Sequence, residues 1–557
     1  MKTINITVRK MVPLFLAGAF VGSVGCTSDF ESINNNPNGL EANQIPVESR
    51  FAMPMQSIYL NYQNRDYEYQ LQQNLNADLY SGYLANPTPF GGNNNNSTYS
   101  LNDGWNNMPF RAGVLYVMKP VSQIIKSATD MGYSDYIALA KIIRVAAIHR
   151  VSDIYGPVPY SKAMQGGQSV PYDSQESLYN QFFDELEEAA NSLTTFVDSD
   201  PAAAVGRIKS FDQMCEGDYV RWIRFANTLR LRLAMRIVKV NPTKAKEEAE
   251  AAIAQKYGVL TSTDKNIEVK SDILTNPLQV ICFAYDDCRI GASYESILKG
   301  YADPRLEKTM LPVGWKQSGG KPMDILDKEG KPLGYVGQYI GIRQGTIIPD
   351  KSNYLMYSNV NMSATDKLTS SYPLPIMKVA EAYFLRAEGA LRGWNVGGSA
   401  QELYEEGIRV SFNEHDISSS AYDTYIADDT RMAADYVDPF NTGNNIKGVN
   451  KVTVKWDNGA DNEVKLQKII TQKWIAMFPE GQEAWSEFRR TGYPKLFPVV
   501  ENRSGGAIPN GEFIKRLPFT LDERNTNLPA VEEARQLLNG PDNAGTRLWW
   551  DVNKANF

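Results

Sequence analysis

The side chains that most often carry out catalysis are scarce in this 557-residue sequence. Its two histidines, His149 and His415, lie far apart, and it has neither an H-E-x-x-H nor a G-x-S-x-G pattern. A histidine-based triad or a zinc site is therefore hard to build. Carboxylates are abundant, but nothing singles out the facing pair that a glycoside hydrolase needs. We predict no catalytic residue, no metal site and no cofactor.

Aromatic rings and side-chain amides gather instead in two stretches that read as loops. Residues 78–105 combine several rings with four consecutive asparagines, and a second aromatic group begins at Trp315. Apolar faces of sugar rings stack on aromatic side chains, and sugar hydroxyls bond to amides. Extended peptides bind to the same chemistry, so both ligand classes stay open. The predicted ligand residues are Tyr83, Asn94, Trp105, Trp315, Tyr335 and Tyr339.

Cys26 is the third chemically informative residue, because it directly follows an apolar run from Met11 to Val24. The run is shorter than the roughly 20 residues of a membrane span and has the layout of a secretory signal. Residues 23–26, Ser-Val-Gly-Cys, resemble the lipobox of bacterial lipoproteins, although serine stands where leucine is usual. The resemblance implies cleavage before Cys26 and attachment of lipid to its thiol. An ordinary secreted protein is the alternative.

The residues after Cys26 predict a tether. The stretch 27–40 is acidic and rich in asparagine, so it cannot bury enough apolar surface to fold. Its acidic residues resemble the surface-export signal of Bacteroidetes lipoproteins, which implies the outer face of the outer membrane. We divide the chain into a signal peptide at 1–25, a lipidated tether at 26–40 and one domain at 41–557.

Composition narrows the possible partners. The net charge of −7 argues against nucleic acid, whose phosphates require a basic surface. Beyond the signal, no apolar stretch is long enough to span a membrane. Three cysteines remain after Cys26, too few for a disulfide scaffold. Cys282 and Cys288 are close enough in sequence to bridge a local loop, but we predict free thiols.

The segments that must position these loops are helical. In residues 136–151, apolar side chains recur at steps of three and four, which predicts one buried helix face. Similar patterns occupy 174–193, 217–237, 375–394 and 466–478. Several helices form pairs with short loops, in which small residues stand beside large aromatics, as in tetratricopeptide-like hairpins. We predict a mainly α fold with a few short strands and loop-rich insertions at about 82–106, 261–373 and 416–462.

Two local patterns give more detailed expectations for these helices. Asp173 with Glu176 fits a capping box better than Ser174 with Ser177, and Asp218 is a cap candidate for the helix that follows it. We interpret a stripe of arginines along that helix as a salt-bridged, solvated face. The stripe comprises Arg221, Arg224, Arg232 and Arg236.

An ordered set of short blocks resembles the SusD/RagB-like outer-membrane lipoproteins. The set begins with "VSDIYGPVPYSKAM" at 151–164, continues at 170–193 and covers nearly the whole chain. No block is decisive alone, but the order is specific. The further blocks lie at 29–39, 217–237, 303–306, 337–345, 373–394 and 468–494.

The resemblance implies tetratricopeptide-like hairpins and a lid over a SusC-like TonB-dependent transporter. Such proteins capture oligosaccharides, or peptides in some members, and have no catalytic activity. It also implies that "IYGPVPYS" holds helices in place and binds no ligand. We therefore predict a lipid-anchored protein that delivers glycans to the transporter. The alternatives are an oligopeptide-binding member, a lipid-anchored glycoside hydrolase and an adaptor that only grips a membrane partner.

Overall fold

The computed structural model is mainly helical, as the sequence predicts. From Val47 to Phe557 the chain forms one compact unit. The signal sequence, Cys26 and the tether lie outside the described residues. The structure describes residues 46–59, 65–167, 169–200, 202, 205–269, 276–315, 321–362 and 374–557.

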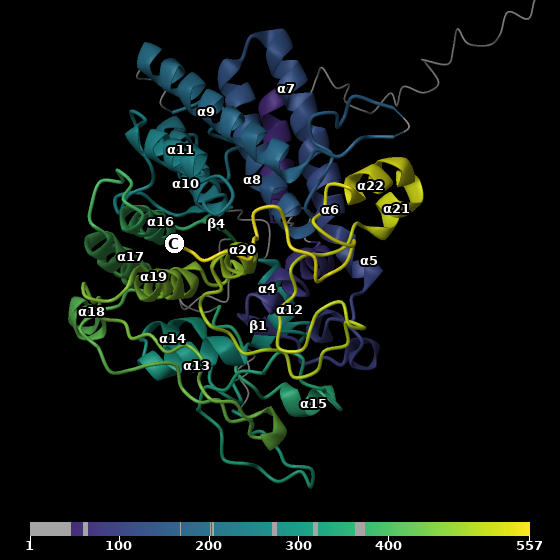
Figure 1. Ribbon diagram of the computed structural model, residues 1–557, viewed down its shortest axis with the longest axis vertical. Coiled ribbons are helices and arrows are strands. Elements are labelled where there is room, and N and C mark those ends of the chain that lie inside the picture. The colour runs from purple at the N-terminus through teal and green to yellow at the C-terminus, as the bar shows by residue number, and fades with distance from the viewer. Residues whose placement is uncertain are drawn as a thin grey trace, which may run out of the picture. The chain divides into compact units, whose positions relative to one another are not determined.

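Five helices in the first half of the chain pack in sequence order, each against the next (Figure 1). The first and last connections in this row are short, as in the predicted hairpins, whereas the two middle connections are much longer. They are α7 (Lys119–Met131), α8 (Ser134–Tyr155), α9 (Gln175–Ser199), α10 (Tyr219–Arg236) and α11 (Pro242–Ala254).

A second helical group follows later in the chain, and its helix α16 packs against α17, α19 and the earlier α10. Contact between α10 and α16 joins the two groups into one scaffold (Figure 1). The group comprises α16 (Val379–Leu391), α17 (Ala400–Glu414), α18 (Ser419–Ile426), α19 (Asn462–Met477) and α20 (Gly481–Thr491).

Loops, short helices and two small sheets make up most of the rest. Strand β1 (Leu84–Ala85) is antiparallel to β3 (Arg289–Ile290), and β2 (Ile267–Val269) is antiparallel to β4 (Leu374–Met377). The short helices are α2 (Ala52–Ser57), α3 (Asp66–Tyr69), α4 (Ala77–Tyr80), α5 (Asp103–Asn106), α6 (Met108–Ala112), α12 (Pro277–Phe283), α13 (Ala292–Tyr301), α14 (Arg305–Thr309), α15 (Lys351–Tyr354), α21 (Leu521–Thr526) and α22 (Leu528–Arg535).

One of the two helix caps is as predicted. Asp218 caps α10 by accepting the backbone N–H of Arg221. At α9 the capping-box prediction is wrong, because Ser174 is the cap. Asp173 instead accepts the backbone N–H groups of Tyr160 and Ser161 at 2.9 Å each. The carboxylate thus fastens the "IYGPVPYS" segment after α8 to the start of α9, which is the scaffold role predicted for it.

The predicted solvated face of α10 is wrong for three of its four arginines, because Arg221 is buried as well as the last two. Arg232 and Arg236 are 2% and 0% exposed. Arg232 donates to both carboxylate oxygens of Glu381 on α16, at 2.8 and 2.6 Å. Arg236 pairs with Glu483 and, at 2.7 Å, with Glu487 on α20. The stripe points inward because α16 and α20 cover it and supply the opposite charges.

Lys473 of α19 completes this cluster. Its ammonium lies 3.2–3.3 Å from the carboxylates of Glu381, Glu483 and Glu487. Removing one member of a buried ion pair typically costs about 3–5 kcal/mol, because the remaining charge has neither water nor a partner. We call this cluster the ion junction; its members are Arg232, Arg236, Glu381, Lys473, Glu483 and Glu487.

Two further sequence expectations concern membrane and redox properties. No helix in the described part of the chain is long and apolar enough to cross a bilayer. Cys282 and Cys288 are buried free thiols, as predicted. Burial, and then the adjacent thiol of Cys288, raise the pKa of Cys282 well above its usual value, so it stays protonated.

Candidate functional site

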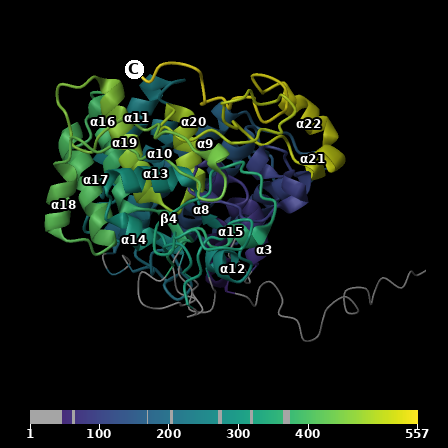
Figure 2. The same ribbon diagram turned by 90° about the horizontal axis from the view of Figure 1, so that it is seen from below.

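Three strongly exposed aromatic rings lie on segments that are far apart in sequence but linked in space. Tyr67 and Trp315 are each 55% exposed, and Tyr285 is 39% exposed. Tyr67 belongs to α3, which packs against α12, the helix that precedes Tyr285. Figure 2 shows α3, α12 and α15 as neighbours. We call this set, Tyr67, Tyr285 and Trp315, the ring surface.

Asp287 ties together the segments around Tyr67 and Tyr285. Its carboxylate accepts hydrogen bonds from Gln70, at 3.1 Å, and from the hydroxyl of Thr88. Lys351 of α15 adds an ion pair at 2.8 Å. Four segments that are distant in the chain therefore meet at one carboxylate, which is itself mostly buried. The arrangement holds Tyr285, two residues earlier, in place against α3.

The loop of Tyr285 is also fixed from its other side. Lys351 donates to the backbone carbonyl of Tyr285 at 2.9 Å. Asp286 adopts a left-handed backbone conformation with φ of 53°, which turns the chain sharply. Arg289 pairs with Asp286 at 3.2 Å and donates to the carbonyl of Leu355 just after α15. The exposed ring of Tyr285 thus projects from a braced turn.

Asp66 supplies an incompletely paired acceptor beside these rings. Its Oδ1 is enclosed yet accepts no hydrogen bond within the described residues. Burial raises the pKa of Asp66. Burial also raises the pKa of the Tyr285 hydroxyl, with smaller contributions from Asp66 and Asp287. An enclosed acceptor without a donor costs free energy, and such groups are typical of functional positions.

The predicted residues Trp315, Tyr335 and Tyr339 meet in one lobe. The backbone N–H of Val313 donates to the carbonyl of Gln338, and the N–H of Gly337 donates to the carbonyl of Val313. The loop of Trp315 therefore pairs with the segment between Tyr335 and Tyr339. Gly314 donates to Met356, which joins the Trp315 loop to the segment after α15. Tyr335 and Tyr339 are half-buried against the hydrophobic core, so Trp315 is the most accessible ring of the three.

Asn94 and Trp105 belong to a second group. Asn94 is exposed, and its Oδ1 accepts a hydrogen bond from Arg503 at 2.9 Å. Trp105 is half-buried and packs edge-on against Phe90, with ring centroids 5.3 Å apart. The neighbouring Asn93 is hydrogen-bonded in both directions to Ile348. This loop therefore docks on the lobe of Trp315, while its own polar groups are largely occupied.

Tyr83 corrects the prediction, because its side chain is inaccessible. It is 0% exposed, and its hydroxyl donates to the carbonyl of Trp474. The rings of Tyr294 and Phe478 contact it edge-on, with centroids 5.7 and 5.3 Å away. Strand β1 follows directly and pairs with β3, which draws Tyr83 into the core. It supports the loops from within the core.

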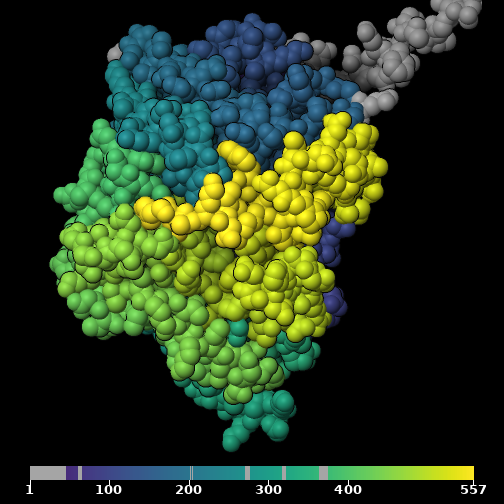
Figure 3. Space-filling view, viewed as in Figure 1, coloured from purple at the N-terminus to yellow at the C-terminus, as the bar shows by residue number. Residues whose placement is uncertain are grey.

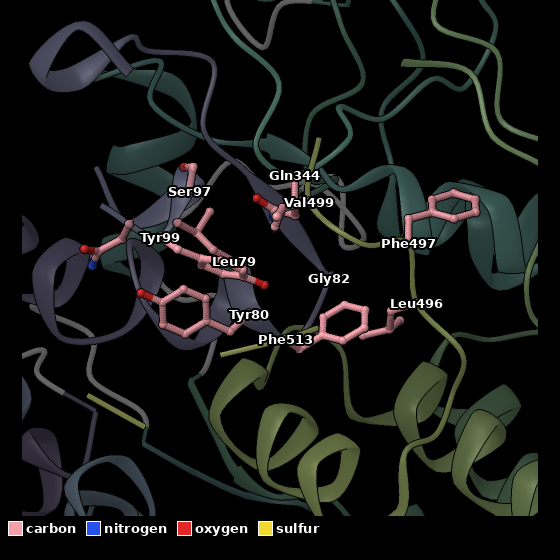
Figure 4. Close-up of a pocket in the computed structure, with 11 residues that line it drawn as sticks. Leu79, Tyr80, Gly82, Ser97, Tyr99, Gln344, Leu496, Phe497, Val499 and Phe513 are labelled. Atoms are coloured by element: carbon pink, nitrogen blue, oxygen red, sulfur yellow. The ribbon is translucent and has the colours of Figure 1, made fainter. Parts of the chain in front are cut away.

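A narrow crevice behind the asparagine run is lined mainly by core side chains (Figure 4). Tyr80 and Tyr99 are only 6% and 4% exposed there. The side chain of Gln344 donates to the carbonyl of Leu84 and so links the Trp315 lobe to β1. We assign this crevice a supporting role, because its rings are too enclosed to stack on a sugar.

Tyr67, Tyr285 and the linking carboxylate of Asp287 are not among the residues predicted from the sequence. The sequence does contain an indication of them in "DYEY" and "YDDC", where tyrosines stand next to acidic residues outside the long periodic helices. Only the contacts between α3, α12 and α15 show that these short segments share one surface. Within the described residues, no group of three or more His, Cys, Asp or Glu side chains is arranged to hold a metal ion.

Comparison with known proteins gives consistent matches over almost the whole chain. A family model described as SusD-like (Susd and RagB outer membrane lipoprotein) matches residues 31–551. No curated protein gives a significant match. Solved structures do, and three illustrate the range.

The first is a chitin-binding SusD homologue from Flavobacterium johnsoniae, 45% identical with a TM-score of 0.83, covering 92% of this chain and 100% of that one. A SusD homologue from Bacteroides vulgatus is 34% identical with a TM-score of 0.83, covering 92% and 98%. A solved chitin-binding protein is 26% identical with a TM-score of 0.68, covering 90% and 100%.

Proposed function

Because this chain belongs to the SusD-like family of outer-membrane lipoproteins, we propose that it captures chitin-type oligosaccharides on its ring surface. The observation that carries the proposal is a set of three exposed rings: Tyr67 and Tyr285 lie on segments held together by Asp287, and Trp315 lies on the loop that bonds to Met356 just after α15. Each N-acetylglucosamine unit offers an apolar ring face for stacking and an amide for polar contacts.

Binding without bond cleavage is the chemistry that this surface supports. Exposed rings supply contact area at low entropic cost, because a tyrosine or tryptophan has few side-chain torsions to fix. The free acceptor on Asp66 suits a hydroxyl or amide donor of the ligand. Hydrolysis would require two facing carboxyl groups roughly 5–10 Å apart across the sugar, and we assign no such pair.

Delivery to a membrane transporter completes the proposal. We propose that residues 1–25 are removed, that Cys26 carries the lipid and that residues 26–40 tether the domain to the outer membrane. The domain would then release its oligosaccharide unchanged to a SusC-like TonB-dependent transporter. Replacing Cys26 with alanine should abolish labelling by radioactive fatty acid and release the protein from the membrane.

Titration calorimetry with chitohexaose tests the ligand assignment. We expect binding to the wild type, weaker binding to Trp315→Ala and Tyr285→Ala, and unchanged binding to Phe557→Ala, which removes an exposed ring elsewhere. Cellohexaose, which lacks the N-acetyl groups, should bind more weakly. Binding of a tetrapeptide panel in place of chitohexaose would assign the peptide alternative, and released reducing ends would assign a hydrolase.

A further inference from the structure

A second concavity, of about 710 Å³, lies beneath the C-terminal tail and shares no lining residue with the ring surface. Its floor includes the end of α20, and residues 552–556 of the tail form one wall. Figure 3 shows the C-terminal segment, in yellow, crossing this face. In Figure 2 the C-terminus lies at the opposite edge from α3, α12 and α15. Volumes of this order are typical of small-molecule sites.

We call this concavity the basic crevice, because most of the charged side chains that line it are positive, although the whole chain carries a net charge of −7. Seven lysine and arginine side chains line it, against two glutamates, and three of the seven, Arg490, Lys515 and Arg547, already form ion pairs. One of those glutamates, Glu463, is already occupied, since it accepts hydrogen bonds from Tyr493 and Asn556 at 2.6 Å each. A cleft walled by one sign of charge concentrates the electrostatic potential and attracts the opposite ion.

Several of these cations have no carboxylate partner within the described residues. Lys239 donates to the backbone carbonyl of Lys554 at 3.0 Å, and the ammonium of Lys495 lies 4.6 Å from the ring centroid of Tyr493. Arg489 is 5% exposed and donates to the carbonyl of Lys515 at 2.8 Å. Neutral acceptors satisfy their geometry, and carboxylates such as Asp551 act on Lys239 and Arg489 without forming an ion pair with them.

Mutual repulsion among these cations is visible in their acid–base behaviour. Burial, and then the neighbouring charge of Arg490, lower the pKa of Lys239 to about 8. Burial, and then Arg547, lower the pKa of Lys515. In both lysines burial is the larger cause, and repulsion from a neighbouring arginine adds to it. A bound anion would relieve that repulsion.

We propose that the basic crevice is a second ligand site, which takes a compact polyanion of about di- to trisaccharide size carrying two or more carboxylate, sulfate or phosphate groups. Lysine and arginine donate charge-assisted hydrogen bonds to such oxyanions, and these are the strongest hydrogen bonds that side chains make. The site is independent of the ring surface, so the protein binds neutral and acidic ligands on different faces.

Calorimetry on the mature chain with two charged probes and one neutral probe tests this proposal. Trigalacturonate carries carboxylates, tripolyphosphate carries phosphates, and maltotriose is a neutral sugar of matched size. We expect micromolar binding of at least one charged probe, weakened by added salt, and none of maltotriose. Which charged probe binds distinguishes acidic sugars from phosphates as the source.

Substitutions locate the site. The double variant Lys239→Gln, Lys495→Gln should bind the charged probe about 100-fold more weakly, which is roughly tenfold for each lost charged contact. Its affinity for chitohexaose should be unchanged. Glu512→Gln removes a negative charge from the lining and should strengthen binding about two- to threefold. The control Lys447→Gln removes the same charge from a residue outside the crevice and should change nothing.

Failure of both charged probes to bind, or equal binding to the wild type and the double variant, would overturn the proposal. Because Glu512→Gln tightens binding where a merely destabilising change would not, it separates a ligand site from a structural role. If chitohexaose did not bind to the wild type but a charged probe did, the proposed function would be contradicted and the proposal for the basic crevice would be supported.

Discussion

In the ion junction, Arg236 is completely buried and held by carboxylates of α20, whereas at the ring surface Tyr285 is 39% exposed and Asp66 keeps an oxygen without a donor. Both regions join segments that are distant in sequence through a charged group, Lys473 in one and Asp287 in the other. The difference is that the junction satisfies its charges internally and the ring surface leaves capacity for a ligand. Pairing and exposure together therefore separate scaffold from site in this protein.

The largest expected effect comes from breaking the ion junction. Arg236→Met leaves Glu483 and Glu487 buried without this partner and should lower the free energy of unfolding by about 3–5 kcal/mol. Urea denaturation measures the loss. The control Lys447→Met removes a cation that is 88% exposed and should cost less than about 0.5 kcal/mol. Similar losses of stability in the two variants would contradict the view that the buried ion junction stabilises the fold more than an exposed ion pair does.

Acid should weaken the same junction. Burial alone would raise the pKa of Glu483, but Arg236, Lys473 and Arg232 lower it to about 2. A depressed pKa in the folded state gives stability that is complete above about pH 4.5, the ordinary glutamate value, and lost as the pH falls toward 2. The predicted contribution is about 3 kcal/mol.

Chemical denaturation of the wild type and Glu483→Gln across that pH range checks this effect. The stability difference between the two proteins should shrink as the pH falls from 4.5 toward 2. A constant difference would show that Glu483 keeps the same pKa in the folded and unfolded chains.

At the ring surface, a substitution should affect binding and spare the fold. Tyr285→Ala should reduce chitohexaose affinity about tenfold, because an exposed aromatic anchor is lost. The free energy of unfolding should fall by no more than about 1 kcal/mol, since the ring is 39% exposed and is not part of the hydrophobic core clusters. Paired calorimetry and urea denaturation measure the two quantities. Equal loss of stability and affinity would instead mark Tyr285 as part of the scaffold.

The smallest effect belongs to Tyr83, which sharpens the boundary between scaffold and site. Tyr83→Phe removes the hydrogen bond to Trp474 and should cost about 1 kcal/mol of stability. Chitohexaose affinity should not change, because the side chain is 0% exposed. A clear fall in affinity without loss of stability would restore Tyr83 as a ligand residue.

The sequence by itself was sufficient for the helical scaffold, the Asp218 cap, the free thiols and the family resemblance. These depend on local periodicity, short-range capping and the order of motifs along the chain, all of which neighbouring residues determine. It also identified Trp315, the ring that remains most accessible in its lobe.

Tertiary structure decided which way side chains face. The arginine stripe reads as solvated from its spacing alone, yet α16 and α20 cover Arg232 and Arg236 with carboxylates. Tyr83 sits in a loop-like stretch, but the pairing of β1 with β3 carries it inside. Tyr67 and Tyr285 come together because α3 packs against α12, and Lys351 of α15 fixes the Tyr285 loop. The spacing of residues along one helix determines which of its faces each side chain lies on. What covers that face depends on packing between segments that are distant in sequence.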